Sequence, residues 1–257
     1  MSYLAAVLLV LAAALAAGAA SWLSGRVLSV EARRRRHEVA FTVFGQLGLM
    51  ISVLLAFVFS EVWDEYRTAA ASIDGECGAL HGAAMLAAAL PNDAGAPVVR
   101  AIGDYTRTVV TVEWPMMAKR RVSPQASEGI RRALTEAARI NVAGPAQAAT
   151  QGQILSLLAQ AHAERETRTF QLTQAAPAFL WFVVIVLSLI LILFIVLAGI
   201  ENPAHLILGA GYAASIVLVL VLVRMLDYPF EGALALGDSD FVKTFGEVGS
   251  LIKGAAP

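Results

Sequence analysis

Charged residues are scarce in this chain of 257 amino acids. Only 15% of its residues are Asp, Glu, Lys or Arg, whereas 58% are hydrophobic; soluble domains average about 25% charged and 45–50% apolar residues. The deficit is concentrated in four long stretches without any charge, which is typical of helices that cross a membrane. The near balance of 19 basic and 20 acidic residues gives no electrostatic reason to expect nucleic acid as a partner. We therefore expect an integral membrane protein.

Residues that build catalytic and metal sites are also few. The single cysteine, Cys77, excludes an internal disulfide and a metal site made of cysteines alone. The sequence has four scattered histidines and no HExxH, GxSxG or phosphate-binding glycine motif. Cys77 and His81 are one helical turn apart, but two ligands from one helix leave a metal site incomplete, so packing is the favoured interpretation. We expect no catalytic residue, no cofactor and no metal ion, and hence not an enzyme.

The four uncharged stretches predict membrane spans. They cover about residues 3–25, 39–60, 177–200 and 203–223. At 1.5 Å per residue, about 22 residues extend roughly 33 Å, which suffices for a hydrocarbon core of about 30 Å. The first stretch also has the small residues of a signal-peptide cleavage site, but its length and the lack of basic residues before it favour a retained helix.

Two features of the connections predict the topology. The turn that begins at Glu201 is short and Pro203 can open the next helix, so the last two spans should form an antiparallel hairpin. The loop between the first two spans contains Arg33, Arg34, Arg35 and Arg36, and short cytoplasmic loops are enriched in basic residues. We therefore place this loop in the cytoplasm and the segment between spans two and three on the opposite side. The predicted location is the plasma membrane or bacterial inner membrane, crossed several times.

The segment between spans two and three predicts helices only. Span two continues as an alanine-rich helix up to the break at residues 91–95. A second helix from Pro97 has inward-facing apolar residues at three- and four-residue spacing and should be interrupted around Glu113-Trp-Pro115, because proline lacks the backbone donor and clashes one turn back. A third helix should begin at Ser123, and a fourth should run from Ala146 into span three. The buried positions expected on the second and third helices are Val98, Ile102, Tyr105, Val109, Ile130 and Leu134.

These expectations define an all-α integral membrane protein with four transmembrane helices in a 2+2 arrangement around a helical extramembrane domain. The predicted parts are residues 1–63 (spans one and two with the arginine-rich loop), 64–176 (the helical domain), 177–227 (the hairpin of spans three and four) and 228–257 (a C-terminal tail).

Several residue groups resemble the bestrophin-like integral membrane family of bacteria and plants. They are the arginine-rich stretch before span two, Leu54-Leu-Ala-Phe57, Trp63-Asp-Glu-Tyr66, Glu76, Tyr105, Glu113-Trp-Pro115, Pro177-Ala-Phe-Leu-Trp181 and Leu226-Asp-Tyr-Pro-Phe-Glu-Gly232. The resemblance implies an oligomeric ion channel whose helical region lies outside the bilayer. It also implies that this region is cytoplasmic, whereas the arginines of this chain place it on the other side; we give precedence to the arginines.

Acidic residues follow spans two and four and are candidates for an ion vestibule or gate. They are Glu61, Asp64, Glu65, Asp227 and Glu231. Around an oligomer axis such carboxylates would concentrate cations and disfavour anions. The favoured alternative is that they are ordinary polar residues where the chain leaves the lipid.

Glu113 and Trp114 extend this set. The segment Glu113-Trp-Pro115 and the segment after span four have the same feature: each places a carboxylate beside an aromatic ring and a proline. One interpretation is an ion-binding or gating collar. The favoured interpretation is structural: the ring anchors the chain at the membrane, and the carboxylate caps a helix or pairs with Arg100, Arg107 or Arg168.

Within the predicted spans, Gln46 is the candidate polar residue of a pore. No ionisable residue lies in the middle of a span, so the usual component of a proton relay is missing. The leading functional hypothesis is a passive ion channel of the bestrophin-like kind, with membrane lipid, further copies of the chain and an inorganic ion as partners. The alternative is a non-conducting scaffold or sensor whose helical domain binds another molecule.

Overall fold

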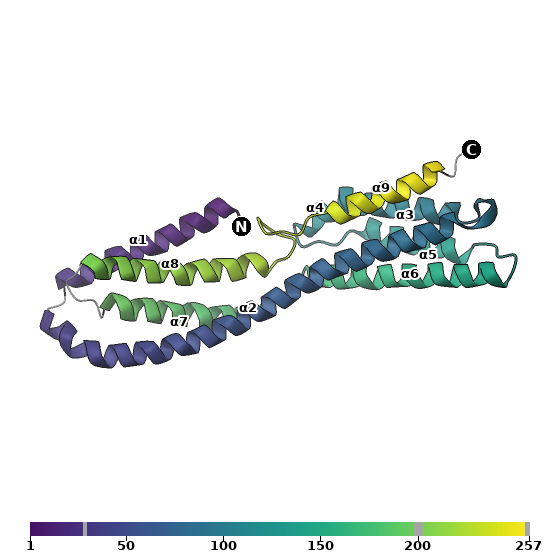
Figure 1. Cartoon of the computed structure of the whole chain (residues 1–257). Coiled ribbons are helices and arrows are strands. Elements are labelled where there is room, and N and C mark those ends of the chain that lie inside the picture. The colour runs from purple at the N-terminus through teal and green to yellow at the C-terminus, as the bar shows by residue number, and fades with distance from the viewer. Residues whose placement is uncertain (28–29, 198–202, 255–257) are drawn as a thin grey trace. The chain divides into compact units, whose positions relative to one another are not determined.

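The computed structural model describes residues 1–27, 30–197 and 203–254, and within them every regular element is a helix (Figure 1). The α-helices are α1 (Tyr3–Val27), α2 (Val30–Ala88), α3 (Ala96–Thr108), α4 (Trp114–Met117), α5 (Pro124–Ala138), α6 (Pro145–Phe170), α7 (Ala178–Leu197), α8 (Pro203–Leu226) and α9 (Ser239–Gly254). A 3-10 turn, η1 (Pro91–Asp93), and a π-helical turn, η2 (Val109–Glu113), complete the set. The all-α prediction is confirmed.

The chain divides into two compact units. The first comprises residues 1–64 and 175–227, and the second comprises residues 65–174 and 228–257. Helix α2 contributes its first part to one unit and its last part to the other. Four helices of the described residues, α1, α2, α7 and α8, are long and apolar enough to cross a membrane, as predicted.

In the first unit, α1 packs along α8 and also contacts α7. The packing is close because the facing side chains are small: a Cβ added to Gly18 would lie 3.9 Å from Cβ of Ala210, and one added to Gly209 would lie 3.3 Å from Oγ of Ser21. Small residues allow such an approach between helices in lipid, where hydrophobicity alone gives no preference for one partner. Ser24 adds a hydrogen bond from its hydroxyl to the carbonyl of Val196 at 3.0 Å.

The first unit bears on two predictions about the hairpin of spans three and four. Helix α8 begins at Pro203, where a proline costs no helical hydrogen bond. The predicted turn before it, at Glu201, lies outside the described residues. Large apolar side chains such as Leu15, Phe179 and Ile207 are exposed on these helices, as expected for surfaces that face lipid or another copy of the chain.

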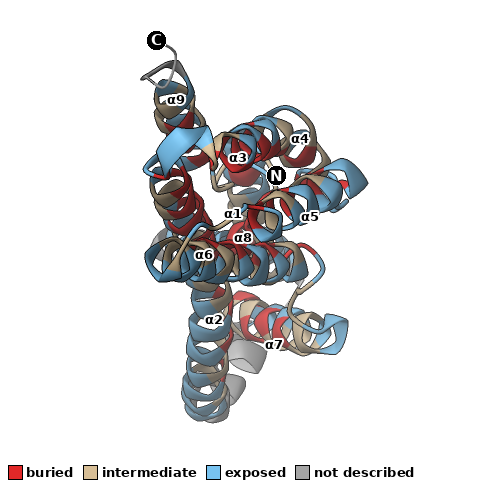
Figure 2. Ribbon diagram, turned by 90° about the vertical axis from the view of Figure 1, so that its right-hand side faces the viewer, coloured by how far each residue is buried: buried red, intermediate tan, exposed pale blue. Residues whose placement is uncertain are grey.

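The second unit has its own core, formed by the last part of α2 with α3, α5, α6 and α9. Buried residues, red in Figure 2, occupy the inner sides of these helices. The predicted core positions Val98, Ile102, Tyr105, Val109 and Ile130 are fully or almost fully buried, and Leu134 is partly buried against them. The three- and four-residue spacing therefore identified the inner faces of α3 and α5 correctly.

One local expectation, about α6, was wrong, and two others take a different form. The interruption predicted around Glu113-Trp-Pro115 is the π-helical turn η2, which ends at Glu113, and the chain remains helical to Met117. Helix α6 does not continue into span three: it ends at Phe170, and α7 begins at Ala178, after a segment that contains Pro177. Residues 228–257, predicted as a C-terminal tail, include α9, which packs against α3.

Candidate functional site

Four charged side chains are buried together inside the second unit. Glu76 lies on α2, Glu113 ends the π-helical turn η2, and Arg165 and Arg168 lie one turn apart on α6. Their side chains are between 0% and 2% exposed. Because burial of an unpaired charge is very costly, such groups must neutralise one another. We call these four residues the ion cluster.

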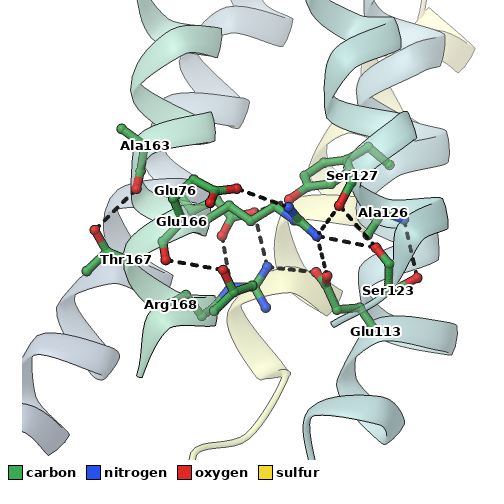
Figure 3. A network of polar contacts seen from close by, with 12 residues as sticks. Glu76, Glu113, Ser123, Ala126, Ser127, Ala163, Glu166, Thr167 and Arg168 are labelled. Carbon is green, nitrogen blue, oxygen red and sulfur yellow. Dashed lines mark hydrogen bonds and ion pairs between the residues drawn. The ribbon is translucent and has the colours of Figure 1, made fainter. Parts of the chain in front are cut away.

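Arg168 is the centre of the ion cluster (Figure 3). Its Nε donates to Oε2 of Glu76 at 2.9 Å, and its Nη2 donates to Oε2 of Glu113 at 3.0 Å. Arg165 reaches the other oxygen of Glu113, with Nη2 at 2.6 Å from Oε1. The phenol of Tyr105 donates to Oε1 of Glu76. The two carboxylates and two guanidinium groups therefore balance in charge and share their hydrogen bonds.

Neighbouring side chains complete the enclosure. Arg165 also donates to Oγ of Ser127 at 3.0 Å, in the first turns of α5. The guanidinium carbon of Arg168 lies 5.5 Å from the ring centre of Trp114 and 5.1 Å from that of Phe241, distances at which a cation is attracted by an aromatic face. One polar centre thus receives side chains from elements far apart in the sequence, namely α2, α3, η2, α4, α5, α6 and α9.

Burial and the facing charges together set the protonation states of this centre. Loss of solvent raises the pKa of Glu76 above its ordinary value, against the opposing effects of Arg168 and Tyr105. Burial alone would lower the pKa of Arg168, but Glu76, Tyr105 and Glu113 outweigh it and raise the pKa. Burial also raises the pKa of Tyr105 well above its ordinary value, further helped by Glu76. Arg168 therefore stays charged, and Tyr105 keeps its proton and acts as a donor.

The geometry of the ion cluster suits a structural role. The described residues contain no group of three or more His, Cys, Asp or Glu side chains arranged to hold a metal ion. The π-helical turn that ends at Glu113 has a clear effect: it turns this carboxylate into the core, where both arginines meet it. Such turns are rare inside helices and are retained where they place a particular side chain.

The candidate residues for a vestibule differ in their surroundings. In the first unit, Glu61 and Asp64 are exposed one turn apart on α2, whereas Asp227 is buried and its Oδ1 accepts the backbone N–H of Ala176 at 2.8 Å. In the second unit, Glu65 is half-buried, and Glu231 accepts from Arg120, whose Nη2 lies 2.7 Å from Oε2. The carboxylates with free access to solvent are therefore Glu61 and Asp64.

The other candidates have different environments. Glu113 is enclosed in the ion cluster, and the predicted pairing with Arg168 is confirmed, so this carboxylate lines no surface of the chain. Trp114 is partly buried and packs edge-on against Phe230, with ring centres 5.9 Å apart. Gln46 is exposed on α2. The residues Arg33, Arg34, Arg35 and Arg36 belong to the first turns of α2, but their side chains lie outside the described part.

Arg165 was not predicted as a member of the site, although the sequence contains a signal for it. The inner face of α6 follows a regular three- and four-residue spacing of buried positions: Ile154, Leu158, Ala161, Arg165 and Arg168. Two arginines at the next inward-facing positions of the helix must either be exposed, where the buried face ends, or pair with buried acidic residues. Glu76 and Glu113, at inward positions of α2 and η2, are those acids.

Comparison with known proteins agrees with this architecture. The family model described as the Bestrophin-like domain matches residues 11–241. A bestrophin homologue from Klebsiella pneumoniae superimposes with a TM-score of 0.74 at 13% sequence identity, covering 95% of this chain and 98% of that chain. A structure titled only as a membrane protein variant gives a TM-score of 0.76 at 13% identity, covering 93% of this chain and 97% of that chain. No curated protein matches the sequence.

The fold therefore defines an all-helical membrane protein of the bestrophin type. Because the family match extends over most of its length, the chain belongs to the bestrophin-like family. At 13% identity, the structural likeness establishes the fold and does not transfer residue roles.

Proposed function

We propose that this protein forms a homo-oligomer that lets inorganic ions pass the membrane passively. Membership of the bestrophin-like family supports this function. The observation that carries the proposal is one exposed face of α2 in the first unit. Its positions follow three- and four-residue spacing over five turns: Gln46, Met50, Val53, Phe57, Ser60 and Asp64.

The chemistry of this face matches that of a gated pore. Polar residues are at its two ends, Gln46 at one and Ser60 with Asp64 at the other, and three large apolar side chains lie between them. Met50, Val53 and Phe57 are 50%, 64% and 62% exposed in the single chain. When several copies surround an axis, a ring of such side chains forms a hydrophobic constriction that opens and closes by wetting. We name Met50, Val53 and Phe57 the apolar band.

Cations are the preferred ions in this proposal. Glu61 and Asp64 follow the apolar band on α2, and both are exposed. Repeated by symmetry around an axis, these carboxylates would raise the local concentration of cations and repel anions. Since Asp227 and Glu231 have partners in the chain, they are weaker candidates for this role than the sequence indicated.

Ion flux from liposomes that contain the purified full-length protein tests the proposal. We expect monovalent cation flux from the wild type, an increase of several-fold in Phe57→Ala, because the constriction widens, and a reduced cation preference in Asp64→Asn. Phe182→Ala is the matched control, since Phe182 is equally exposed but lies on α7 (61% exposed) and should leave the flux unchanged.

Two results would reject this function. The first is negligible flux from folded, oligomeric wild type and from all variants, which is what a non-conducting scaffold would give. The second is an equal change in Phe57→Ala and Phe182→Ala, because then the face of α2 has no special role in conduction.

A further inference from the structure

A groove runs along α3 beside the C-terminal helix α9, on the outside of the second unit. Its main part has a volume of about 590 Å³ and is lined by Arg100, Asp104 and Arg107 of α3 together with Phe245, Gly246 and Gly249 of α9. A smaller pocket of about 240 Å³ continues it and shares Arg100. The main volume lies within the range of about 300–1,000 Å³ that is usual for small-molecule sites.

The way α9 docks explains why this space is open. Phe241 and Val248 of α9 are fully buried, and α9 lies directly against Gly103 of α3, since a Cβ there would be in van der Waals contact with Val248, 3.7 Å from its Cγ1. Beside this contact, α9 presents Gly246 and Gly249, where an added Cβ would meet nothing within 4 Å. The helix is thus held on one side by buried side chains, and two glycines leave space between the Phe245 and Ile252 side chains that line the groove.

The charges in the groove point to the kind of ligand. Arg100 and Arg107 are seven residues apart on one face of α3, about 10 Å along the helix axis, and Asp104 lies between them. All three are exposed, and in the described part of the chain the side chains of Arg100 and Asp104 have no hydrogen bond or ion pair. The guanidinium of Arg107 is held over the ring of Phe245 at 5.2 Å. The main groove therefore carries a net positive charge beside an aromatic and aliphatic wall.

We propose that this groove binds a small organic anion, namely a carboxylate or phosphate ester attached to an aromatic or otherwise apolar body. A guanidinium group binds either anion through two parallel hydrogen bonds. The ring of Phe245 and the side chain of Ile252, which also lines the groove, offer contact to the apolar body. Asp104 accepts a hydroxyl or ammonium group of the ligand and disfavours a second negative charge. Because the ligand contacts both α3 and α9, it would stabilise the docking of α9.

Titration calorimetry with the full-length protein in neutral phosphatidylcholine nanodiscs tests this site. Phenyl phosphate and benzoate are the probes, and we expect saturable binding of one molecule per chain. Arg100→Gln and Arg107→Gln should each weaken binding at least about tenfold, because each removes a charge-assisted hydrogen bond. Gly249→Leu should abolish binding by filling the groove, while its backbone has room for the new side chain.

Two matched controls separate binding from damage to the fold. Arg132→Gln removes an exposed arginine of α5, and Gly152→Leu adds a side chain at an exposed glycine of α6 where a Cβ also meets nothing within 4 Å. Both should bind phenyl phosphate like the wild type. Absence of saturable binding, equal binding by Gly249→Leu and Gly152→Leu, or stronger binding of benzylamine than of benzoate would overturn the proposal. Equal affinity for inorganic phosphate and phenyl phosphate would overturn the apolar part of the assigned ligand.

Discussion

Replacement of Arg168 by methionine tests the energetics of the ion cluster. Methionine keeps an unbranched apolar side chain, though a shorter one, and removes the charge that faces both Glu76 and Glu113. Glu113 keeps Arg165 at 2.6 Å, whereas among the described residues Glu76 keeps only the hydroxyl of Tyr105 as a hydrogen-bond partner. A buried ion pair that loses one partner typically costs about 3–5 kcal/mol, because an uncompensated charge remains in the core. We expect Arg168→Met to destabilise the protein by that amount.

Thermal unfolding in detergent micelles, followed by circular dichroism, measures this effect. For a chain of this size about 1 kcal/mol corresponds to roughly 2–4 °C, so Tm should fall by roughly 10 °C. The double variant Glu76→Gln/Arg168→Met should recover part of the loss, since the unpaired acid is gone and neighbouring changes are not additive. Arg132→Met, on the exposed face of α5, is the control and should change Tm very little.

The pH dependence of the same variant provides a second check. Burial already raises the pKa of Glu76 in the wild type, and Arg168 opposes that shift; without Arg168 the pKa should rise further. An acid whose pKa is higher in the folded state loses its contribution to stability as the pH rises through that value. Arg168→Met should therefore melt at a higher temperature at pH 5 than at pH 8, and Glu76→Gln should remove this difference. A Tm of Arg168→Met equal to that of Arg132→Met at both pH values would refute the reasoning.

Three further predictions concern single sites. Burial raises the pKa of the Cys77 thiol to about 12, so the folded protein should resist maleimide labelling at pH 7–9 while the urea-unfolded protein reacts quickly; fast labelling of the folded form would contradict this burial. Ser123→Ala should lower stability by about 1 kcal/mol, because Oγ of Ser123 caps α5 by accepting the N–H of Ala126, and denaturant unfolding would show no change if the cap were unimportant. Gly95→Ala should prevent normal folding, since the new Cβ would lie 1.9 Å from the carbonyl oxygen of Ala87. Gly78→Ala should instead stabilise α2 by about 0.5–1 kcal/mol, because its new Cβ would meet nothing within 4 Å. Equal expression and equal Tm of the two variants would refute this contrast.

The membrane spans and most helices could be predicted because their signals are local. A stretch such as residues 177–197 has no charged residue, so its exposure to water is unfavourable, and it is long enough to cross lipid. Its composition alone therefore determines its environment. The inner face of α3 could likewise be predicted from the spacing of Val98, Ile102 and Tyr105, because a helix places these positions on one side. The exceptions, the π-helical turn at Glu113 and the end of α6 at Phe170, depend on what those segments pack against.

The candidate site was less accessible from the sequence. Acidic residues after a span look alike in one dimension, and the chain gives no local sign that Asp227 caps a backbone amide while Asp64 is exposed. Glu76 and Arg168 are 92 residues apart, so their pairing required the fold. The groove beside α9 could not be predicted for the same reason: residues 239–254 line it only because the fold packs them against α3.

Composition and residue pattern alone were enough to identify this chain as a helical membrane protein, since hydrophobicity, length and helical period act within each segment and need no partner. The identity of the charges that are buried together, the exposure of others on α2, and the space that α9 leaves along α3 depended on the packing of the folded chain. Those outcomes depend on distances between segments far apart in the chain, and electrostatic attraction, desolvation and packing act only at short range once the fold has brought the groups together.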